Sequence, residues 1–321
     1  MEKKHAVLLV SLGTPESPTK NDVRRFLRDF LSDKRVVDVA RIIWLPVLYL
    51  IILPFRSIRV AKLYQKIWFE NDSPLRFYTR TQSEKLAEKL APDNIHVDYA
   101  MTYGKPSIAD KIAEFSKLGI SDLTVLPLYP QYSVSTTAAV FDQVADAYKN
   151  QFDFPALNFI HDYHDHPLYI QGLADSIKQS WKTNGQSECL IFSFHGIPKR
   201  YVTLGDAYQR HCERTVELVV QSLGLDDSQY KLCYQSRVGR EEWLTPYLDK
   251  TLPEIAAQGI KSIDVISPAF ACDCLETLEE LAIENKETFI EAGGSSYHYI
   301  PCLNDSEQHI ALLSSLVKGE C

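Results

Sequence analysis

A histidine closes one of the most apolar stretches of the chain. The run 189–194 is apolar except for Ser193, and His195 follows it directly. A short apolar run that ends at glycine and proline indicates a buried parallel strand followed by a tight loop. His195 then lies at the carboxyl end of a strand, the edge where open α/β sheets bind ligands. A neutral imidazole there can accept a proton or ligate a metal, although a core histidine bonded only to backbone would show the same pattern.

A run of carboxylates follows a second strand-like segment. Three glutamates recur at every fourth position and so share one helix face: Glu276, Glu280 and Glu284. Asp273 precedes Glu276 by the spacing of a capping box, and a solvated acidic face would explain the rest. Because like charges repel at this spacing, the same face would also suit a hard or borderline divalent metal. The nearby Cys272 and Cys274 have no second pair, so we expect two buried thiols.

The rest of the chain alternates strands with helices. Helix-length segments separate eight strand-like runs, which are 6–12, 95–103, 123–129, 157–163, 188–194, 230–236, 263–270 and 297–302. Such alternation implies right-handed crossovers and parallel sheets. The segment 11–15 after the first strand resembles 193–198 after the fifth, which indicates an internal duplication. We therefore expect an α/β fold of two similar doubly wound domains, each with a four-stranded parallel sheet flanked by helices.

The predicted boundary between the domains falls where a helix begins near Pro167. The first domain is expected to span residues 1–165 and the second residues 166–305. The segment 306–321 is long enough to form a terminal helix that packs back on the first domain. Neither G-x-G-x-x-G nor G-x-x-x-x-G-K-S/T occurs, which argues against a Rossmann dehydrogenase and a P-loop NTPase.

The composition is that of a globular protein. The 321 residues are 45% hydrophobic and 24% charged, and the net charge is −8. This charge, with no long Lys/Arg run, argues against nucleic acid as the main partner. The chain enters a strand-like run almost at once, so we expect no signal peptide. Seven cysteines without a C-x-x-C spacing predict neither a disulfide framework nor a zinc ribbon, and a reducing cytoplasm is the expected setting.

One segment departs from this pattern. The thirteen residues 42–54 are uncharged and mostly apolar, and are too few to span a bilayer. Basic residues follow at helical spacing, namely Arg56, Arg59, Lys62 and Lys66. An apolar segment beside a basic amphipathic helix suits a membrane surface, the alternative being a buried helix pair.

Several motifs together resemble those of the ferrochelatases. They lie at 126–137, 193–198 with 205–208, 234–239 with 243–246, and 273–278. They occur in the family's order over nearly the whole chain. The resemblance implies insertion of ferrous iron into protoporphyrin IX, the terminal step of haem biosynthesis, by a chelatase-like lyase of two Rossmann-like domains.

The resemblance also implies roles for individual residues. His195 matches the family's active-site histidine, and Glu276 matches the carboxylate that faces it across the porphyrin. Both are expected to be catalytic, and with Glu280, on a proposed metal or proton path, to form the metal site. Residues expected to bind the substrate are Leu12, Tyr103, Tyr129, Ser193 and Trp243. The segment 42–54 falls at the family's hydrophobic, membrane-facing lip.

The sequence departs from the family pattern at several positions. Animal members hold a 2Fe–2S cluster with a cysteine-rich tail and one further cysteine, which here is Val134. Since the sequence also ends at Cys321, we expect no iron–sulfur cluster and no other cofactor, Fe²⁺ being a substrate. Position 274 is Cys where many members carry His. Thr102 stands where some members place Arg, so another residue must help to bind the propionates.

The expected partners are protoporphyrin IX, ferrous iron and a membrane surface contacted peripherally, without nucleic acid. The expected location is the cytoplasm, at the inner face of the cytoplasmic membrane. A coproporphyrin chelatase, a chelatase for another divalent metal and a non-catalytic porphyrin or haem carrier are the alternatives. Coproporphyrin is water-soluble and needs no apolar lip, so 42–54 favours protoporphyrin. The presence of both His195 and Glu276 argues against a carrier.

Overall fold

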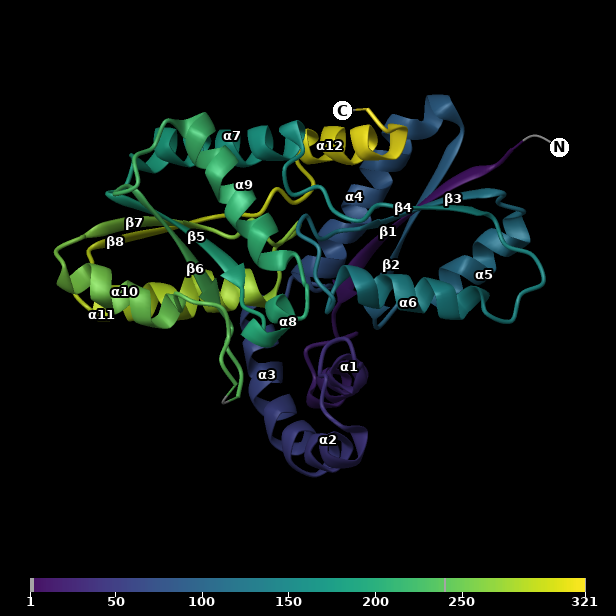
Figure 1. Ribbon diagram of the computed structural model, residues 1–321, viewed down its shortest axis with the longest axis horizontal. Coiled ribbons are helices and arrows are strands. Elements are labelled where there is room, and N and C mark those ends of the chain that lie inside the picture. The colour runs from purple at the N-terminus through teal and green to yellow at the C-terminus, as the bar shows by residue number, and fades with distance from the viewer. Residues whose placement is uncertain (1–2, 240, 321) are drawn as a thin grey trace. The chain divides into compact units, whose positions relative to one another are not determined.

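The structure is a computed structural model that describes residues 3–239 and 241–320 of the chain. The chain forms two compact units (Figure 1). Unit 1 comprises Met1–Tyr129, Ser133–Asp162 and Ile310–Cys321, and unit 2 comprises Pro130–Tyr132 and Tyr163–His309. The division after Asp162 lies three residues before the predicted domain boundary.

Unit 1 is built on a parallel sheet with the strand order β2-β1-β3-β4. Its strands are β1 (His5–Gly13), β2 (Ile95–Tyr103), β3 (Asp122–Pro127) and β4 (Ala156–Phe159). The central strand β1 is apolar and almost wholly buried, as a strand covered on both faces must be. All four predicted strands are confirmed. The third and fourth end earlier than expected, β3 at a proline, which has no N–H to donate to a neighbouring strand.

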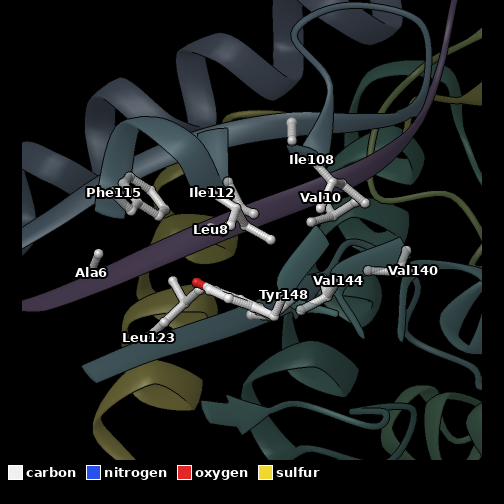
Figure 2. Packing of buried hydrophobic residues seen from close by; sticks show 12 residues of the cluster. Ala6, Leu8, Val10, Ile108, Ile112, Phe115, Leu123, Val140, Val144 and Tyr148 are labelled. Atoms are coloured by element: carbon white, nitrogen blue, oxygen red, sulfur yellow. The ribbon is translucent and has the colours of Figure 1, made fainter. Parts of the chain in front are cut away.

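Helices make up most of the rest of unit 1. They are α1 (Lys20–Ser32), α2 (Arg41–Val47), η1 (Leu48–Ile52), α3 (Leu53–Ile67), α4 (Pro74–Leu90), η2 (Ala91–Asp93), α5 (Ile108–Leu118), α6 (Thr137–Tyr148) and most of α12 (Glu307–Lys318). Figure 2 shows the core between the sheet and the helices α5 and α6, where Leu8 and Val10 of β1 meet Ile112 and Val144. This packing fixes the position of β1, whose carboxyl end carries Leu12 and Gly13.

Unit 2 repeats the topology of unit 1. Its sheet has the order β6-β5-β7-β8, again parallel, which is the arrangement that the internal duplication predicts. The strands are β5 (Cys189–His195), β6 (Tyr230–Gln235), β7 (Ser262–Ile266) and β8 (Ser296–Ile300). Its helices are α7 (Pro167–Asn184), α8 (Lys199–Thr203), α9 (Tyr208–Leu223), α10 (Leu248–Ala257), η3 (Glu276–Asn285) and α11 (Lys286–Glu291). Figure 1 shows α7 and α9 on one side of this sheet and α10 with α11 on the other.

In unit 2, α10 begins at Leu248, after an irregular loop that contains Pro246. In unit 1, one sequence prediction about a helical segment is wrong. The apolar segment 42–54 does not end where it was expected to end. It continues through η1 into α3, so that Arg41–Ile67 is one helical run of 27 residues, and the argument from a length of thirteen residues fails. By length and composition alone this run could cross a bilayer.

A buried histidine at the start of α12 predicts acid sensitivity. His309 is 1% exposed, and its Nδ1 lies 2.6 Å from the carbonyl oxygen of Asn304. Burial lowers the pKa of His309 from 6.5 to about 4. The unfolded chain therefore binds this proton at a higher pH than the folded chain, and stability falls as the pH drops from 6.5 to 4. At about 1.4 kcal/mol per pH unit, this single group lowers the free energy of unfolding by about 3 kcal/mol.

We expect His309→Gln to remove most of that loss. Urea unfolding of wild type and variant at pH 7 and at pH 4.5 measures the difference. His161→Gln, which replaces a histidine whose side chain is 60% exposed, is the control and should keep the wild-type pH dependence. An unchanged pH dependence in His309→Gln would show that this histidine does not limit acid stability.

Candidate active site

His195 lies at the carboxyl end of β5, as predicted. It is partly exposed, and it pairs in register with Gln235 at the end of β6. Its Nδ1 lies 2.7 Å from the carbonyl oxygen of Gly196. Since a carbonyl can only accept, Nδ1 carries the hydrogen in the neutral ring and Nε2 keeps its lone pair. No hydrogen bond among the described residues reaches Nε2, so the alternative of a core histidine satisfied by backbone is excluded.

An aromatic wall stands beside this imidazole. The ring centroids of His195 and Trp243 are 6.3 Å apart. A Cβ at position 196 would lie 3.1 Å from both Trp243 Cε3 and the carbonyl oxygen of Gln235, so glycine lets the loop approach the wall. The backbone bridge between Pro198 and Trp243 holds the two loops together. The Trp243 ring is therefore held in place beside His195.

Glu280 is held by the end of the neighbouring strand β6. Its carboxylate accepts hydrogen bonds from the backbone N–H of Ser236 at 2.8 Å, from the Ser236 hydroxyl, and from Gln235 Nε2 at 3.1 Å. Ser236 adopts a left-handed φ of 64°, a conformation rare outside glycine and often found at functional sites. Burial raises the pKa of Glu280 above its ordinary value. The bonds from Ser236 and Gln235 and the charge of His195 partly offset this effect.

Glu276 lies one turn before Glu280 on η3. Its backbone carbonyl accepts a hydrogen bond from Gln235 Nε2 at 2.9 Å. Its charge raises the pKa of Glu280, and after burial it is the largest cause of the raised pKa of the Cys274 thiol. The two carboxylates and His195 thus form one group of interacting charges within unit 2, able to hold a divalent cation or to pass a proton.

The helix that carries these glutamates is a π-helix. η3 spans ten residues, whereas most π-helical segments are single turns, which occur frequently at functional sites. Glu276 and Glu280 are partly buried and Glu284 is exposed, so the acidic face runs from the site towards solvent. The solvated-face interpretation therefore holds for Glu284 alone.

The capping box predicted between Asp273 and Glu276 is wrong. The Asp273 carboxylate accepts hydrogen bonds from Tyr299 Oη at 2.6 Å, Asn304 Nδ2 at 2.7 Å and Thr277 Oγ1 at 3.0 Å. Tyr299 and Asn304 anchor the loop before η3 to β8 and to the segment that follows it, and Thr277 ties the loop to the first turn of η3. Glu276 has no part in this anchor, and its side chain instead lies beside the Cys274 thiol.

The other predicted site residues are divided between the two units. Trp243 stands beside His195, but Ser193 is fully buried and its hydroxyl donates to Gln235 Oε1 at 2.7 Å, which leaves it no free donor for a substrate. Ser193 instead orients the Gln235 amide towards η3. Unit 1 holds Leu12, Tyr103 and Tyr129, each at or just beyond the carboxyl end of a strand.

Tyr103 is more buried than we expect for a residue that contacts the substrate. It is 4% exposed, and its hydroxyl donates to Asp33 at 2.8 Å. Burial and the Asp33 charge raise the pKa of Tyr103 well above its ordinary value. Beside it, Gly13 has a φ of 112°, and a Cβ there would lie 1.8 Å from the Tyr103 carbonyl oxygen, so only glycine fits.

Sequence reasoning missed Gln235 and Ser236 as members of the site. Both lie in the motif 234–239, but nothing local indicates that they bond to a glutamate more than forty residues away. Their position at the end of a strand next to β5 was the one available signal.

Comparisons with known proteins support the same interpretation of the site as its geometry does. The family model for ferrochelatase matches residues 4–321. The chain is 53% identical over 319 residues to a ferrochelatase of Vibrio cholerae, covering 99% of each chain. It is 54% identical over 317 residues to ferrochelatase 1 of Shewanella oneidensis, covering 98% of this chain and 95% of the relative.

Two solved structures share the fold at low identity. SirB from Bacillus subtilis has a TM-score of 0.57 at 10% identity, over 99% of this chain and 95% of that one. CbiX, described as the terminal enzyme of sirohaem biosynthesis in denitrifying bacteria, has a TM-score of 0.55 at 13% identity, over 99% and 100%. The fold of two four-stranded units is therefore chelatase-like, and by its sequence the chain belongs to the ferrochelatase family.

Proposed function

We propose that the chain inserts ferrous iron into protoporphyrin IX and releases protohaem, the terminal step of haem biosynthesis. Family membership supports a metal chelatase. The observation that carries the proposal for this site is the tautomer of His195, whose Nδ1–H donates to Gly196 and whose Nε2 is left as a base next to two partly buried carboxylates. No feature of the site favours coproporphyrin or a carrier.

The reaction replaces two protons by one Fe²⁺, so the site must accept protons as the metal enters. A planar porphyrin keeps its nitrogen lone pairs in the ring plane, and bending the ring tips them towards one face. We assign His195 Nε2 as the acceptor of the inner protons, because a neutral imidazole is basic near pH 7. Glu276 and Glu280 hold the cation or carry protons towards solvent, and the raised pKa of Glu280 suits proton transfer.

The test is an anaerobic assay of the purified protein with Fe²⁺ and a reductant. Protoporphyrin IX and coproporphyrin III are supplied separately, and product formation is followed by absorbance. We expect turnover with protoporphyrin to exceed turnover with coproporphyrin. Binding of porphyrin without metal insertion would identify a carrier instead, and preference for coproporphyrin would identify the other chelatase.

We further propose that the enzyme works without a resident cofactor, since Fe²⁺ is itself the substrate. Val134 stands where animal members have an additional cysteine, which supports the absence of an iron–sulfur cluster. The six described cysteines are buried as free thiols. Iron and sulfide analysis of the purified protein, before any porphyrin is added, tests this directly.

Peripheral attachment to a membrane is the third part of the proposal. Large apolar side chains of α2, η1 and the start of α3 are exposed: Ile42, Ile43, Leu50, Ile51 and Phe55. The later part of α3 packs on α1 within unit 1, which ties the helix to the globular unit and favours lying in the interface over crossing it. We therefore propose that the enzyme is cytoplasmic and attaches to the inner face of the cytoplasmic membrane.

Two large side chains of the apolar segment are packed against protein and are not available to a membrane. Trp44 Nε1 donates to the carbonyl oxygen of Leu31 at 2.7 Å, and Leu48 is fully buried. The side chains suited to insertion are instead Leu50 and Phe55, which are 74% and 73% exposed. The basic residues of α3 add about 1 kcal/mol each near anionic lipid, a contribution that salt screens.

We expect co-sedimentation with anionic vesicles at low salt, partly reversed at high salt. Leu50→Ser with Phe55→Ser should weaken binding at both salt concentrations, because it removes the apolar part of the attachment. Phe152→Ser, which replaces an exposed aromatic far along the chain, is the matched control and should bind as the wild type does. If the wild type stays in solution at low salt, the membrane proposal is wrong.

A further inference from the structure

The loop between β6 and α10 presents a cation held by an aromatic ring. Arg237 is exposed, and its guanidinium carbon lies 4.6 Å from the ring centroid of Tyr247. Stacking on an aromatic face fixes the plane of the guanidinium while leaving its edge donors free for a ligand. Arg237 also follows Ser236, the residue that holds Glu280.

The neighbouring cations are already neutralised. Lys199 pairs with Glu242 at 2.8 Å, and Arg200 pairs with Glu241 at 2.5 Å. Arg237 forms no ion pair with any carboxylate in the described part of the chain. Among the described residues of this loop, Arg237 is therefore an oriented guanidinium that is suited to a carboxylate from outside.

The aromatic wall connects this cation to the proton acceptor. Tyr247 Oη accepts from the backbone N–H of Trp243 at 3.3 Å, and the Trp243 ring faces His195. His195, Trp243, Tyr247 and Arg237 thus follow one another across unit 2. A porphyrin has its inner nitrogens at the centre and its propionates on side arms at the periphery. A site that binds it needs a base and a cation separated by an apolar surface, which is the order found here.

We propose that Arg237 binds a propionate carboxylate of the porphyrin and so contributes to the choice of an anionic macrocycle. This inference rests on the proposed function, because it takes the porphyrin as substrate. The guanidinium fork matches the two oxygens of a carboxylate, and Tyr247 holds the fork in place before the substrate arrives.

The test compares Arg237→Gln with wild type for protoporphyrin IX and for its dimethyl ester, in which both propionates are uncharged. Binding is measured by fluorescence quenching in a mild detergent. We expect the variant to bind the free acid about tenfold more weakly, which equals about 1.4 kcal/mol, and the ester less than twofold more weakly. In steady-state assays KM for the free acid should rise while kcat changes little. Lys199→Gln, which removes a cation that is already paired, is the matched control and should bind both porphyrins normally.

A second variant separates charge from geometry. Arg237→Lys keeps the charge but loses the fork, and it should bind the free acid with an affinity between those of wild type and Arg237→Gln. Equal losses for acid and ester, or no loss for the acid, would overturn the inference. Failure of the wild type to insert iron would count against the proposed function alone, since the two binding comparisons do not depend on turnover.

Discussion

His195→Ala is expected to abolish iron insertion while porphyrin binding stays largely intact. The substitution removes Nε2, which has no hydrogen bond to any described residue and keeps its lone pair, and it removes little of the wall formed by Trp243. General-base catalysis contributes about 10²–10⁴-fold, so the loss in kcat should fall in or beyond that range. Anaerobic turnover and fluorescence quenching by porphyrin measure the two effects separately.

The pH dependence distinguishes a proton acceptor from a structural residue. The residual activity of His195→Ala should depend on pH differently from the activity of the wild type, because the variant lacks the Nε2 base. His161→Ala, in an exposed histidine of unit 1, should retain both the rate and the profile. Near-normal turnover in His195→Ala would mean that another base accepts the porphyrin protons.

Glu276→Gln is expected to reduce turnover strongly with little loss of stability. The Glu276 side chain caps no helix, because the Asp273 anchor is formed by Tyr299, Asn304 and Thr277. Glutamine keeps the size of the side chain and the backbone carbonyl that accepts from Gln235, so only the charge is lost. A cation or proton path that depends on that charge should lose about tenfold or more in kcat, corresponding to about 1.4 kcal/mol.

The matched control lies on the same helix. Glu284→Gln removes a charge from the exposed end of η3 and should leave both kcat and the thermal unfolding midpoint nearly unchanged. If Glu276→Gln instead unfolds at a lower temperature and keeps its specific activity, Glu276 is a structural residue. Measuring turnover at several Fe²⁺ concentrations shows whether the loss lies in metal binding or in the step that follows.

The sequence by itself determined the class of fold and the place of His195. The eight strands were visible as short strand-like runs bounded by turn residues, and their alternation with helices leaves parallel sheets as the outcome. His195 follows such a run directly, so its position at the edge of a sheet needs no distant contact. The repeated order of the two sheets was likewise visible as a repeat of local patterns.

Only the tertiary structure decided what holds the carboxylates. Asp273 finds its partners Tyr299 and Asn304 at separations of 26 and 31 residues, and these replace the local capping box. Glu280 is bonded by Ser236 from a separation of 44 residues, and the left-handed turn at Ser236 that aims both donors leaves no mark on composition or periodicity. Such pairings follow from which strands lie side by side, and a one-dimensional pattern does not contain that information.

The apolar segment shows the same division. Composition alone found residues 42–54, because a long uncharged run is a local property. The packing of unit 1 decides which of its side chains face solvent. Trp44 donates a hydrogen bond to Leu31 of α1 and Leu48 is buried, whereas Leu50 and Phe55 stay exposed. A helix carries side chains on all sides, and the element that packs against it decides which face stays exposed to a membrane.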